Sequence, residues 1–364
     1  MMQTKKLHIL ITAPSLDTEK NISGISSVVQ IIIKNNENHS YYHYLLGKPD
    51  NKNIMMQILL LLKRLLFFPL SLWKNHIDLV HQNFPFDPKG ILREFIISQW
   101  CRLFHIPVVL HIHGGIFLMN KTSNKLYLFL VKEIFRNCQA VIVLSSLEKE
   151  SLSRNYQYSS AFILENCIDT SSFLNIKRNK ILSTPTFLFM GRMHESKGLN
   201  DIFDAFKYLK KDDIDFKFLL CGDGPLKEYI VPQFANMLKD QFEYRGIVSG
   251  QKKIDIIQSS DYFLLPSRYG EGLPMALLET MAAGVVPIVT DDASMKNIVK
   301  NEKNGIIVEK KNPEDLYQKT KKLILNPDLY TTFSMNAKNT IAERCDIRNY
   351  IFQLNLIYEI AIMH

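Results

Sequence analysis

Two glutamates, Glu271 and Glu279, stand eight residues apart in the segment PSRYGEGLPMALLE. The apolar run Tyr262–Pro266 predicts a buried strand before them, and Met275–Ala283 predicts a helix that carries the second glutamate. Pro274 suits the first helical turn, where its missing N–H is not needed. The free N–H groups and positive dipole end of that helix favour a phosphate. A phosphate flanked by hydroxyl-binding carboxylates indicates a nucleotide-sugar site.

The whole string PSxxxEGxPxxxLExMAxGxxPI, which continues through Thr280–Thr290, is more specific than the glutamate pair alone. It resembles the E-x7-E signature of the glycosyltransferases group 1 family (family 4), which are retaining enzymes of the GT-B fold. The resemblance implies that Glu279 holds the ribose hydroxyls. It also implies that Glu271, with its neighbours Gly272 and Leu273, holds the donor sugar.

Two cations occur in the segment GRMHESKG, which follows a predicted strand, Thr186–Met190, and opens a predicted helix. Arg192 and Lys197 at this position suit a diphosphate, and they would stabilise the charge that develops on it as the sugar–phosphate bond breaks. Taken alone, the segment could equally be a solvated loop. It resembles the family's G-R-x4-K-G element, which implies that Gly191, Arg192 and Lys197 belong to the donor site.

Two histidines, His111 and His113, lie at the end of the predicted strand Val108–Ile112. Open α/β sheets bind ligands at the carboxyl ends of their strands, and alternation turns both side chains to one side. The position of His113 resembles that of the family's active-site histidine, which implies a contact with the donor sugar; His111 is a weaker candidate for the same role. No third ligand with suitable local spacing supports a zinc site.

Three further positions resemble family elements that act through their backbone. Gly24 precedes a predicted helix, although Ser23 replaces the first glycine of the family's loop. Gly222 belongs to a G-x-G-P turn, for which we favour a structural role, and Ile247 lies in the segment that meets the nucleobase. The chain departs from the family at Asn297, near the place where a glutamate is common, which puts contacts of the donor sugar there in doubt.

Metal and disulfide chemistry have little support in the sequence. Asp213 and Asp215 mimic a D-x-D motif, but they stand in a polar turn away from the other motifs, and enzymes of this fold usually need no metal. The five cysteines are scattered and lack C-x-x-C spacing, which favours reduced thiols. We expect no cofactor and no metal.

Strand and helix patterns alternate along the chain, which is the rhythm of parallel α/β sheets. We expect two Rossmann-like domains facing a cleft: residues 1–175 for the acceptor and 176–346 for the donor. A polar linker is expected over Ser171–Thr184, and the final helix, 347–364, is expected to pack back on the N-terminal domain. The expected strands are Leu7–Ala13, Ile77–His81, Val108–Ile112, Ala140–Leu144, Ala161–Leu164, Thr186–Met190, Phe216–Cys221, Tyr262–Pro266, Val286–Thr290 and Gly305–Val308.

The positive charge is uneven, because residues 1–175 carry 18 Lys+Arg against 12 Asp+Glu, a net +6 of the total +8. No basic cluster interleaved with aromatics supports nucleic acid, so an anionic membrane surface is the better partner. The apolar segment Ile54–Trp73 bears on this point. Lys63 and Arg64 in its middle and Pro69, expected to interrupt the helix, argue against a transmembrane span. A core helix packed under the sheet and an interfacial or acceptor-facing helix remain as alternatives.

We therefore expect a retaining glycosyltransferase that moves a sugar from a nucleotide-diphosphate sugar to a saccharide or lipid-linked saccharide. The N-terminus is too short and poorly flanked for a signal peptide. The basic N-terminal half and the apolar segment Ile54–Trp73 indicate a cytoplasmic enzyme, expected to be peripheral to the inner face of the plasma membrane. Surface polysaccharide synthesis is the expected setting by family association. Two alternatives stay open: a nucleotide-sugar epimerase of the same fold, and a non-catalytic sugar-binding relative or partner subunit.

Overall fold

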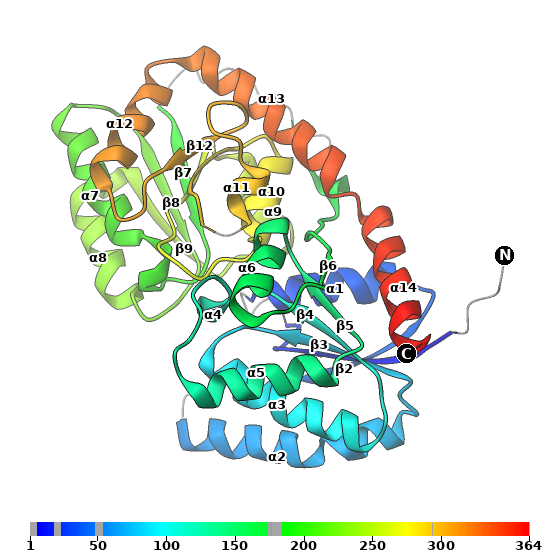
Figure 1. Cartoon of the computed structure of the whole chain (residues 1–364). Helices are drawn as coiled ribbons and strands as arrows, with labels where there is room; N and C mark the ends of the chain where they lie inside the picture. The colour runs from blue at the N-terminus through cyan, green and yellow to red at the C-terminus, as the bar shows by residue number, and fades with distance from the viewer. Residues whose placement is uncertain are drawn as a thin grey trace. The chain divides into compact units, whose positions relative to one another are not determined.

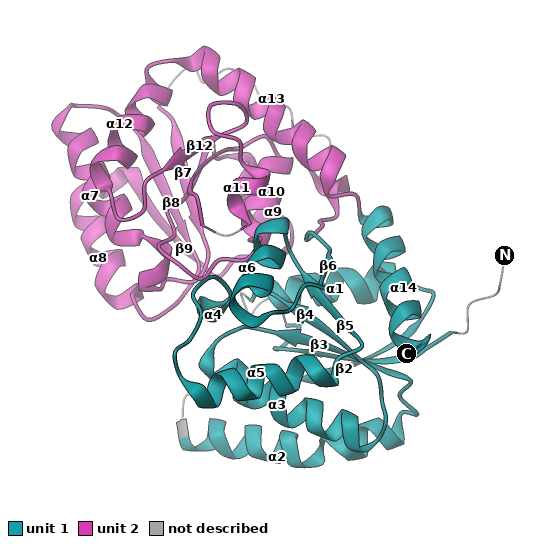
Figure 2. Cartoon of the chain, in the orientation of Figure 1, with its two compact units in different colours: residues 1–166, 347–364 teal, residues 167–346 magenta. Residues whose placement is uncertain are grey.

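The computed structural model describes residues 6–17, 23–47, 54–173, 176, 184–292 and 294–363. It divides into two compact units (Figures 1 and 2). Unit 1 comprises Met1–Asn166 together with Ile347–His364, and unit 2 comprises Cys167–Asp346. The division falls between Asn166 and Cys167, earlier than the expected 175/176. Most of the expected linker, residues 174–175 and 177–183, lies outside the described residues.

Unit 1 is built on a six-stranded parallel sheet with the order β2-β1-β3-β4-β5-β6. The order reverses between β1 and β3, so the loops that follow these two strands diverge at a topological switch point, the usual place for ligands in open α/β sheets. The strands are β1 (His8–Ala13), β2 (Ser40–Leu45), β3 (Leu79–Phe84), β4 (Val108–Ile112), β5 (Ala140–Val143) and β6 (Phe162–Ile163).

Helices cover both faces of this sheet. In Figure 1, α2, α3 and α5 lie on one side and α1 and α14 on the other. Alternate strand residues separate the two layers: Leu10, Val80 and Val108 join the core beneath α2 and α3, whereas His81 faces Tyr358 of α14. The helices are α1 (Gly24–Asn35), α2 (Ile54–Lys74), α3 (Pro88–Leu103), α4 (Ile116–Met119), α5 (Lys125–Asn137), α6 (Ser146–Tyr156) and α14 (Ile347–Met363).

The expectation that Pro69 interrupts the helix was wrong, because α2 runs continuously through it. A proline cannot donate to the carbonyl four residues earlier, here that of Leu65. The indole Nε1 of Trp100 in α3 donates to that carbonyl at 3.1 Å. The neighbouring carbonyl of Arg64 accepts from the Tyr44 hydroxyl at 2.6 Å. Side chains from α3 and β2 thus bond to the backbone where proline weakens the helix.

Unit 2 repeats the parallel α/β plan with a second six-stranded sheet, ordered β12-β11-β10-β7-β8-β9. Read from the other edge, this is the Rossmann order 3-2-1-4-5-6, and its switch point lies between β7 and β10. The strands are β7 (Thr186–Met190), β8 (Lys217–Cys221), β9 (Phe242–Gly246), β10 (Tyr262–Leu265), β11 (Val286–Thr290) and β12 (Ile306–Val308).

The core of unit 2 is rich in aromatic rings. Phe187, Phe206, Phe216 and Phe218 are fully buried, and the rings of Phe206 and Phe216 lie 4.6 Å apart, within the range of favourable aromatic pairs. The helices around the sheet are α7 (Leu199–Lys211), α8 (Lys227–Leu238), α9 (Gly250–Gln258), α10 (Met275–Ala282), α11 (Met295–Ile298), α12 (Pro313–Ile324) and α13 (Pro327–Arg344).

Candidate active site

Glu271 lies in the loop between β10 and α10, as the sequence predicted, and is 6% exposed. Its carboxylate accepts from the hydroxyl of Ser267, and its backbone N–H donates to Asp292 at 2.9 Å. Asp292 is itself paired with Lys310 at 2.5 Å. The glutamate is thus held from both its side chain and its backbone, which fixes the direction in which the carboxylate points.

Lys197 meets Glu271 directly, with Nζ 2.5 Å from Oε1. The lysine ends a short 3₁₀ turn, Glu195–Lys197, after β7. The next residue, Gly198, has φ +71°, and a Cβ there would stand 2.1 Å from the Pro266 carbonyl oxygen. Because only glycine has no Cβ, only glycine allows the turn to pack this closely against the end of β10. This close packing places Lys197 within reach of Glu271. The pair occupies the switch point of the unit 2 sheet.

Arg268 joins the same two loops, and the sequence reasoning missed it. Its guanidinium bonds both oxygens of Asp201 in α7, Nε to Oδ2 at 3.0 Å and Nη2 to Oδ1 at 2.7 Å. Its backbone N–H donates to the Ser196 carbonyl at 2.7 Å. A bidentate arginine–carboxylate pair is geometrically specific, so Arg268 locks the lysine-bearing turn to the glutamate-bearing loop.

Glu279 lies in the second turn of α10, and Pro274 is the N-cap residue, one position before the expected first helical turn. A lysine that the sequence reasoning did not single out, Lys253 in α9, pairs with Glu279 at 2.6 Å. Each carboxylate of the signature therefore has a lysine partner. Gly272 is half-buried and Leu273 is buried between them.

Arg192 is exposed, and within the described part of the chain its side chain has no hydrogen-bond or ion-pair partner. Its neighbour Gly191 packs closely on the turn after β8: a Cβ on Gly222 would stand 1.9 Å from the Gly191 carbonyl oxygen. The structural role favoured for Gly222 therefore has a steric basis. Ile247 lies just after β9 and is half-buried. Asn297 lies in the short helix α11.

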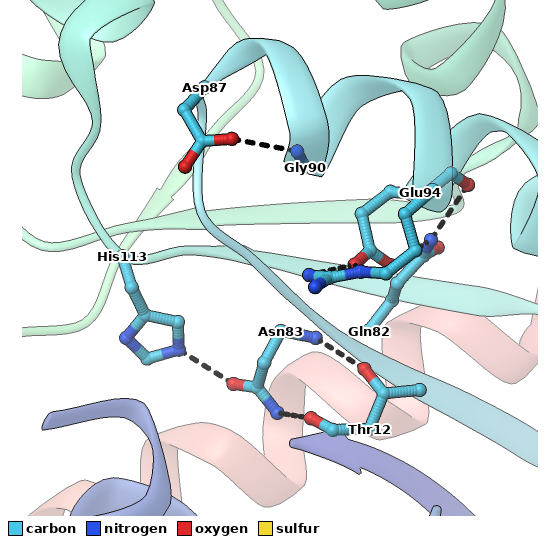
Figure 3. A network of polar contacts seen from close by, with 8 residues as sticks. Thr12, Gln82, Asn83, Asp87, Gly90, Glu94 and His113 are labelled. Carbon is cyan, nitrogen blue, oxygen red and sulfur yellow. Dashed lines mark hydrogen bonds and ion pairs between the residues drawn. The ribbon is translucent and has the colours of Figure 1, made fainter. Parts of the chain in front are cut away.

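In unit 1, His113 lies immediately after β4 at the carboxyl edge of the sheet, close to the switch point. Figure 3 shows its Nε2 directed at the Asn83 amide oxygen, 2.6 Å away. The Asn83 amide nitrogen donates to the Thr12 carbonyl at 2.8 Å, and the Asn83 backbone N–H donates to the Thr12 hydroxyl at 3.0 Å. Because the amide oxygen accepts, Nε2 carries the proton and Nδ1 remains an acceptor.

Three histidines form a row under this edge. The rings of His111 and His113 lie 4.1 Å apart, which confirms that both side chains point to one side. The sequence reasoning passed over His81. Its Nε2 lies 3.2 Å from Nδ1 of His111, and its Nδ1 lies 2.6 Å from the Tyr358 hydroxyl oxygen. Burial lowers the pKa of His81 and of His113 to about 3, and it lowers the pKa of His111 well below its usual value. All three imidazoles are therefore neutral near pH 7.

This row predicts an acid-labile unit 1. Because the folded pKa values lie below the ordinary 6.5, the unfolded chain takes up protons first as the pH falls. The stability is full above about pH 6.5 and falls toward the folded pKa by about 1.4 kcal/mol per pH unit for each histidine. Urea unfolding near pH 7 and near pH 5 measures this slope. His111→Asn removes one of the titrating histidines, so the change of unfolding free energy with pH should decrease by about 1.4 kcal/mol per pH unit. An unchanged slope in that variant would contradict the assignment.

Gly24 begins α1, after the loop that follows β1, and is exposed. Ser23 is the N-cap residue but makes no side-chain hydrogen bond to the first helical N–H groups. Loop residues 18–22 lie outside the described part of the chain. Within the described residues no group of three or more His, Cys, Asp or Glu side chains is arranged to hold a metal ion, and Asp215 instead accepts from Thr184 at 2.7 Å.

Two family models match adjoining parts of the chain: Glycosyltransferase Family 4 over residues 32–172 and Glycosyl transferases group 1 over residues 173–340. The chain is also 30% identical to an uncharacterized glycosyltransferase of Methanocaldococcus jannaschii over 262 residues, 72% of this chain and 70% of that protein. The chain belongs to the glycosyltransferases group 1 family. It is therefore a glycosyltransferase, and the family assignment made from the glutamate signature is confirmed.

Two further comparisons describe what this glycosyltransferase is similar to. It is 24% identical to the UDP-Gal:alpha-D-GlcNAc-diphosphoundecaprenol alpha-1,3-galactosyltransferase of Escherichia coli, over 78% of this chain and 76% of that protein. The structure of Anabaena HepE in complex with UDP-glucose matches with a TM-score of 0.74 at 14% identity, covering 97% of this chain and 98% of that chain. The second likeness shows the GT-B fold, which confirms the predicted fold class.

Proposed function

We propose that this glycosyltransferase moves a sugar, with retention of its anomeric configuration, from a nucleotide-diphosphate sugar to a saccharide or lipid-linked saccharide in surface polysaccharide synthesis. The observation that carries the proposal is the pair of lysine–glutamate contacts, Lys197–Glu271 and Lys253–Glu279. In these contacts the oxygens of both signature carboxylates accept from a lysine, and the same kind of oxygen accepts from sugar hydroxyls.

The residues take separate roles in the proposal. Glu279 holds the ribose hydroxyls, and Glu271 holds hydroxyls of the donor sugar and stabilises positive charge at its anomeric carbon. Lys197 and the exposed Arg192 take the diphosphate, with Lys197 exchanging part of its contact with Glu271 for a phosphate oxygen. Charge develops on the diphosphate as the bond breaks, so these cations act on the transition state. His113 supplies a neutral imidazole to the sugar.

The alpha linkage and lipid-diphosphate acceptor named for the Escherichia coli relative support a retaining reaction on a lipid-linked acceptor. UDP is part of the donor in that relative's name and of the ligand in the HepE complex, so it is the first nucleotide to test. No metal takes part in the proposed reaction, because the two cations already supply the charge that a divalent ion would bring to the diphosphate.

Thermal unfolding with UDP, GDP, ADP, CMP and dTDP tests the donor site. A ligand at about 100 times its Kd should add about 2.7 kcal/mol of stability. We expect a shift with one diphosphate that is lost in Arg192→Ala and retained in EDTA. With that nucleotide's sugars as donors, proton NMR of the product should show the donor's anomeric configuration. The absence of any shift, or an inverted product, would contradict the proposal.

A further inference from the structure

One face of unit 1 exposes only two kinds of side chain. The helices α2, α3 and α5 lie side by side on one side of the sheet (Figure 1), and every exposed side chain on them is either apolar or basic. Ile54 is the one residue of these helices whose side chain is not described. We call this surface the basic apolar face; it consists of Met55, Met56, Ile58, Leu59, Leu62, Lys63, Leu66, Phe67, Leu70, Trp73, Lys74, Lys89, Leu92, Ile96, Arg102, Leu103, Lys125, Leu126, Phe129, Lys132 and Arg136.

The apolar members of this face project far into solvent. Met55 is 80% exposed, Leu66 67% and Trp73 75% on α2, and Leu103 is 64% exposed on α3. Scattered exposed leucines are ordinary, but a contiguous apolar surface on three neighbouring helices marks an interaction site. The helix α2 does pack on the sheet through Leu65, Phe68 and Leu72, but it is not buried as a whole, since only 17% of its apolar window is buried.

The carboxylates on and beside these helices, within the described residues, are buried or half-buried rather than exposed. Asp78 is half-buried and accepts from the His8 N–H at 2.8 Å, and Asp87 caps α3 by accepting from Gly90 at 2.7 Å. Glu94 is fully buried and bonded to Gln82 at 2.7 Å (Figure 3). Glu133 of α5 is half-buried and pairs with Arg136. The exposed charge on the face is thus uniformly positive.

We propose that the basic apolar face docks the enzyme on the surface of an anionic lipid bilayer. Apolar side chains that enter the headgroup boundary and cations that meet anionic headgroups are the two contributions that hold interfacial helices. The tryptophan suits the same boundary because its ring has an apolar body and a polar N–H. This proposal goes beyond the sugar transfer proposed above and does not depend on it.

The structure favours a helix that lies on the membrane rather than one that crosses it. Among the described residues, Met55–Lys74 is the one helix long and apolar enough to span, with a mean hydropathy of 1.7. Yet Leu65, Phe68 and Leu72 are buried in the core of unit 1, so spanning would require that core to open. Lys63, in the middle of the helix, is exposed and can reach the headgroups only if the helix lies flat.

Unit 2 offers a contrast that serves as a control. Leu325 and Met335, beside and within α13, are 62% and 59% exposed, comparable to the leucines of α2. The helices around them also expose Glu314, Asp328 and Glu343, which would repel an anionic surface.

The test is binding of the full-length enzyme to vesicles of phosphatidylglycerol and phosphatidylcholine, against phosphatidylcholine alone, by flotation. We expect binding to the anionic vesicles at low salt and its loss at high salt. The chain has two tryptophans, so Trp100→Phe leaves Trp73 as the sole indole reporter. Its emission should shift to the blue on binding and be quenched by lipids brominated near the headgroups. Equal binding to neutral vesicles, or none to either, would overturn the proposal.

Two sets of variants locate the contact. Each removed cation should weaken binding about fivefold, so Lys63→Gln, Arg102→Gln and Lys132→Gln together should cost on the order of 10²-fold. Lys211→Gln, Lys217→Gln and Lys311→Gln in unit 2 are the matched control. Leu66→Gln with Leu70→Gln should abolish binding, whereas Leu325→Gln with Met335→Gln should leave it unchanged.

Sedimentation velocity separates lipid from a second copy of the chain. A dimer that Leu66→Gln with Leu70→Gln dissociates, in a protein that does not float with vesicles, would assign the face to self-association and overturn the proposal. Because the side chains substituted in the two sets of lysine, arginine, leucine and methionine variants are exposed, these variants should unfold at the wild-type temperature, which excludes a folding defect as the cause.

Discussion

Replacing Lys197 with alanine should lower kcat of sugar transfer by a factor on the order of 10²–10³, the usual cost of losing a fixed electrostatic stabiliser. The Lys197 ammonium lies 2.5 Å from the Glu271 carboxylate. The same side chain is then placed to meet the diphosphate when the donor binds. Removing it takes away a cation whose contact strengthens as the leaving group gains charge, so the loss should fall on kcat more than on KM.

Arg192→Ala provides a second measurement of the same effect. Because Arg192 is exposed and unpaired among the described residues, its removal should lower kcat without changing the unfolding temperature. The matched control is Lys207→Ala in α7, which removes a lysine paired with the exposed Asp204 at 2.9 Å and should leave turnover unchanged. Near-wild-type kcat in both Lys197→Ala and Arg192→Ala would refute the diphosphate assignment.

The second large effect concerns stability: Gly222→Ala should destabilise the protein by about 3 kcal/mol or more. Gly222 has φ +126°, and an added Cβ would stand 1.9 Å from the Gly191 carbonyl oxygen. That oxygen belongs to the backbone, so the turns after β7 and β8 must separate to accommodate the methyl group. Urea unfolding, followed by circular dichroism on the full chain, measures the loss.

Gly250→Ala is the matched control, since Gly250 also has a positive φ, +53°, but a Cβ there meets nothing within 4 Å. It should cost about 1–2 kcal/mol, the strain of a left-handed backbone alone. An equal loss at both positions would show that backbone conformation, rather than the close approach of the two turns, makes glycine necessary at Gly222.

The parts of the site that the sequence predicted are those whose signal is local. The Glu271–Glu279 spacing and the strand and helix around it lie within about twenty residues, so pattern and turn chemistry were sufficient. The partners of these residues come from elsewhere in the chain: Asp292 is 21 residues from Glu271, and Lys197 is 74 residues from it. The sequence around a single lysine or aspartate in a loop does not indicate which distant residue it will pair with.

The elements that were missed or misplaced have a related explanation. In α3, the buried Glu94 and Ser98 interrupt the apolar stripe that would have indicated a helix. The strand β3 begins at Leu79 and ends at Phe84, later than the expected Ile77–His81. Its end was misplaced because its buried polar residues do not fit the apolar pattern expected of a core strand. The signals that could have found α6 and α13 were their N-termini: Ser145 accepts from the Glu148 N–H, and Pro327 opens α13.

The place of α14 in unit 1 has a consequence for biosynthesis. Its Tyr358 bonds His81 in the middle of the sheet, and its Asn355 bonds Asn36 at the end of α1. The ribosome makes the strands of unit 1 before any of unit 2, but it makes α14 only after all of unit 2. While unit 2 is translated, the sheet of unit 1 therefore lacks α14 over its histidine row. Unit 1 is the first domain to be started, but it cannot be completed until all of unit 2 has been made.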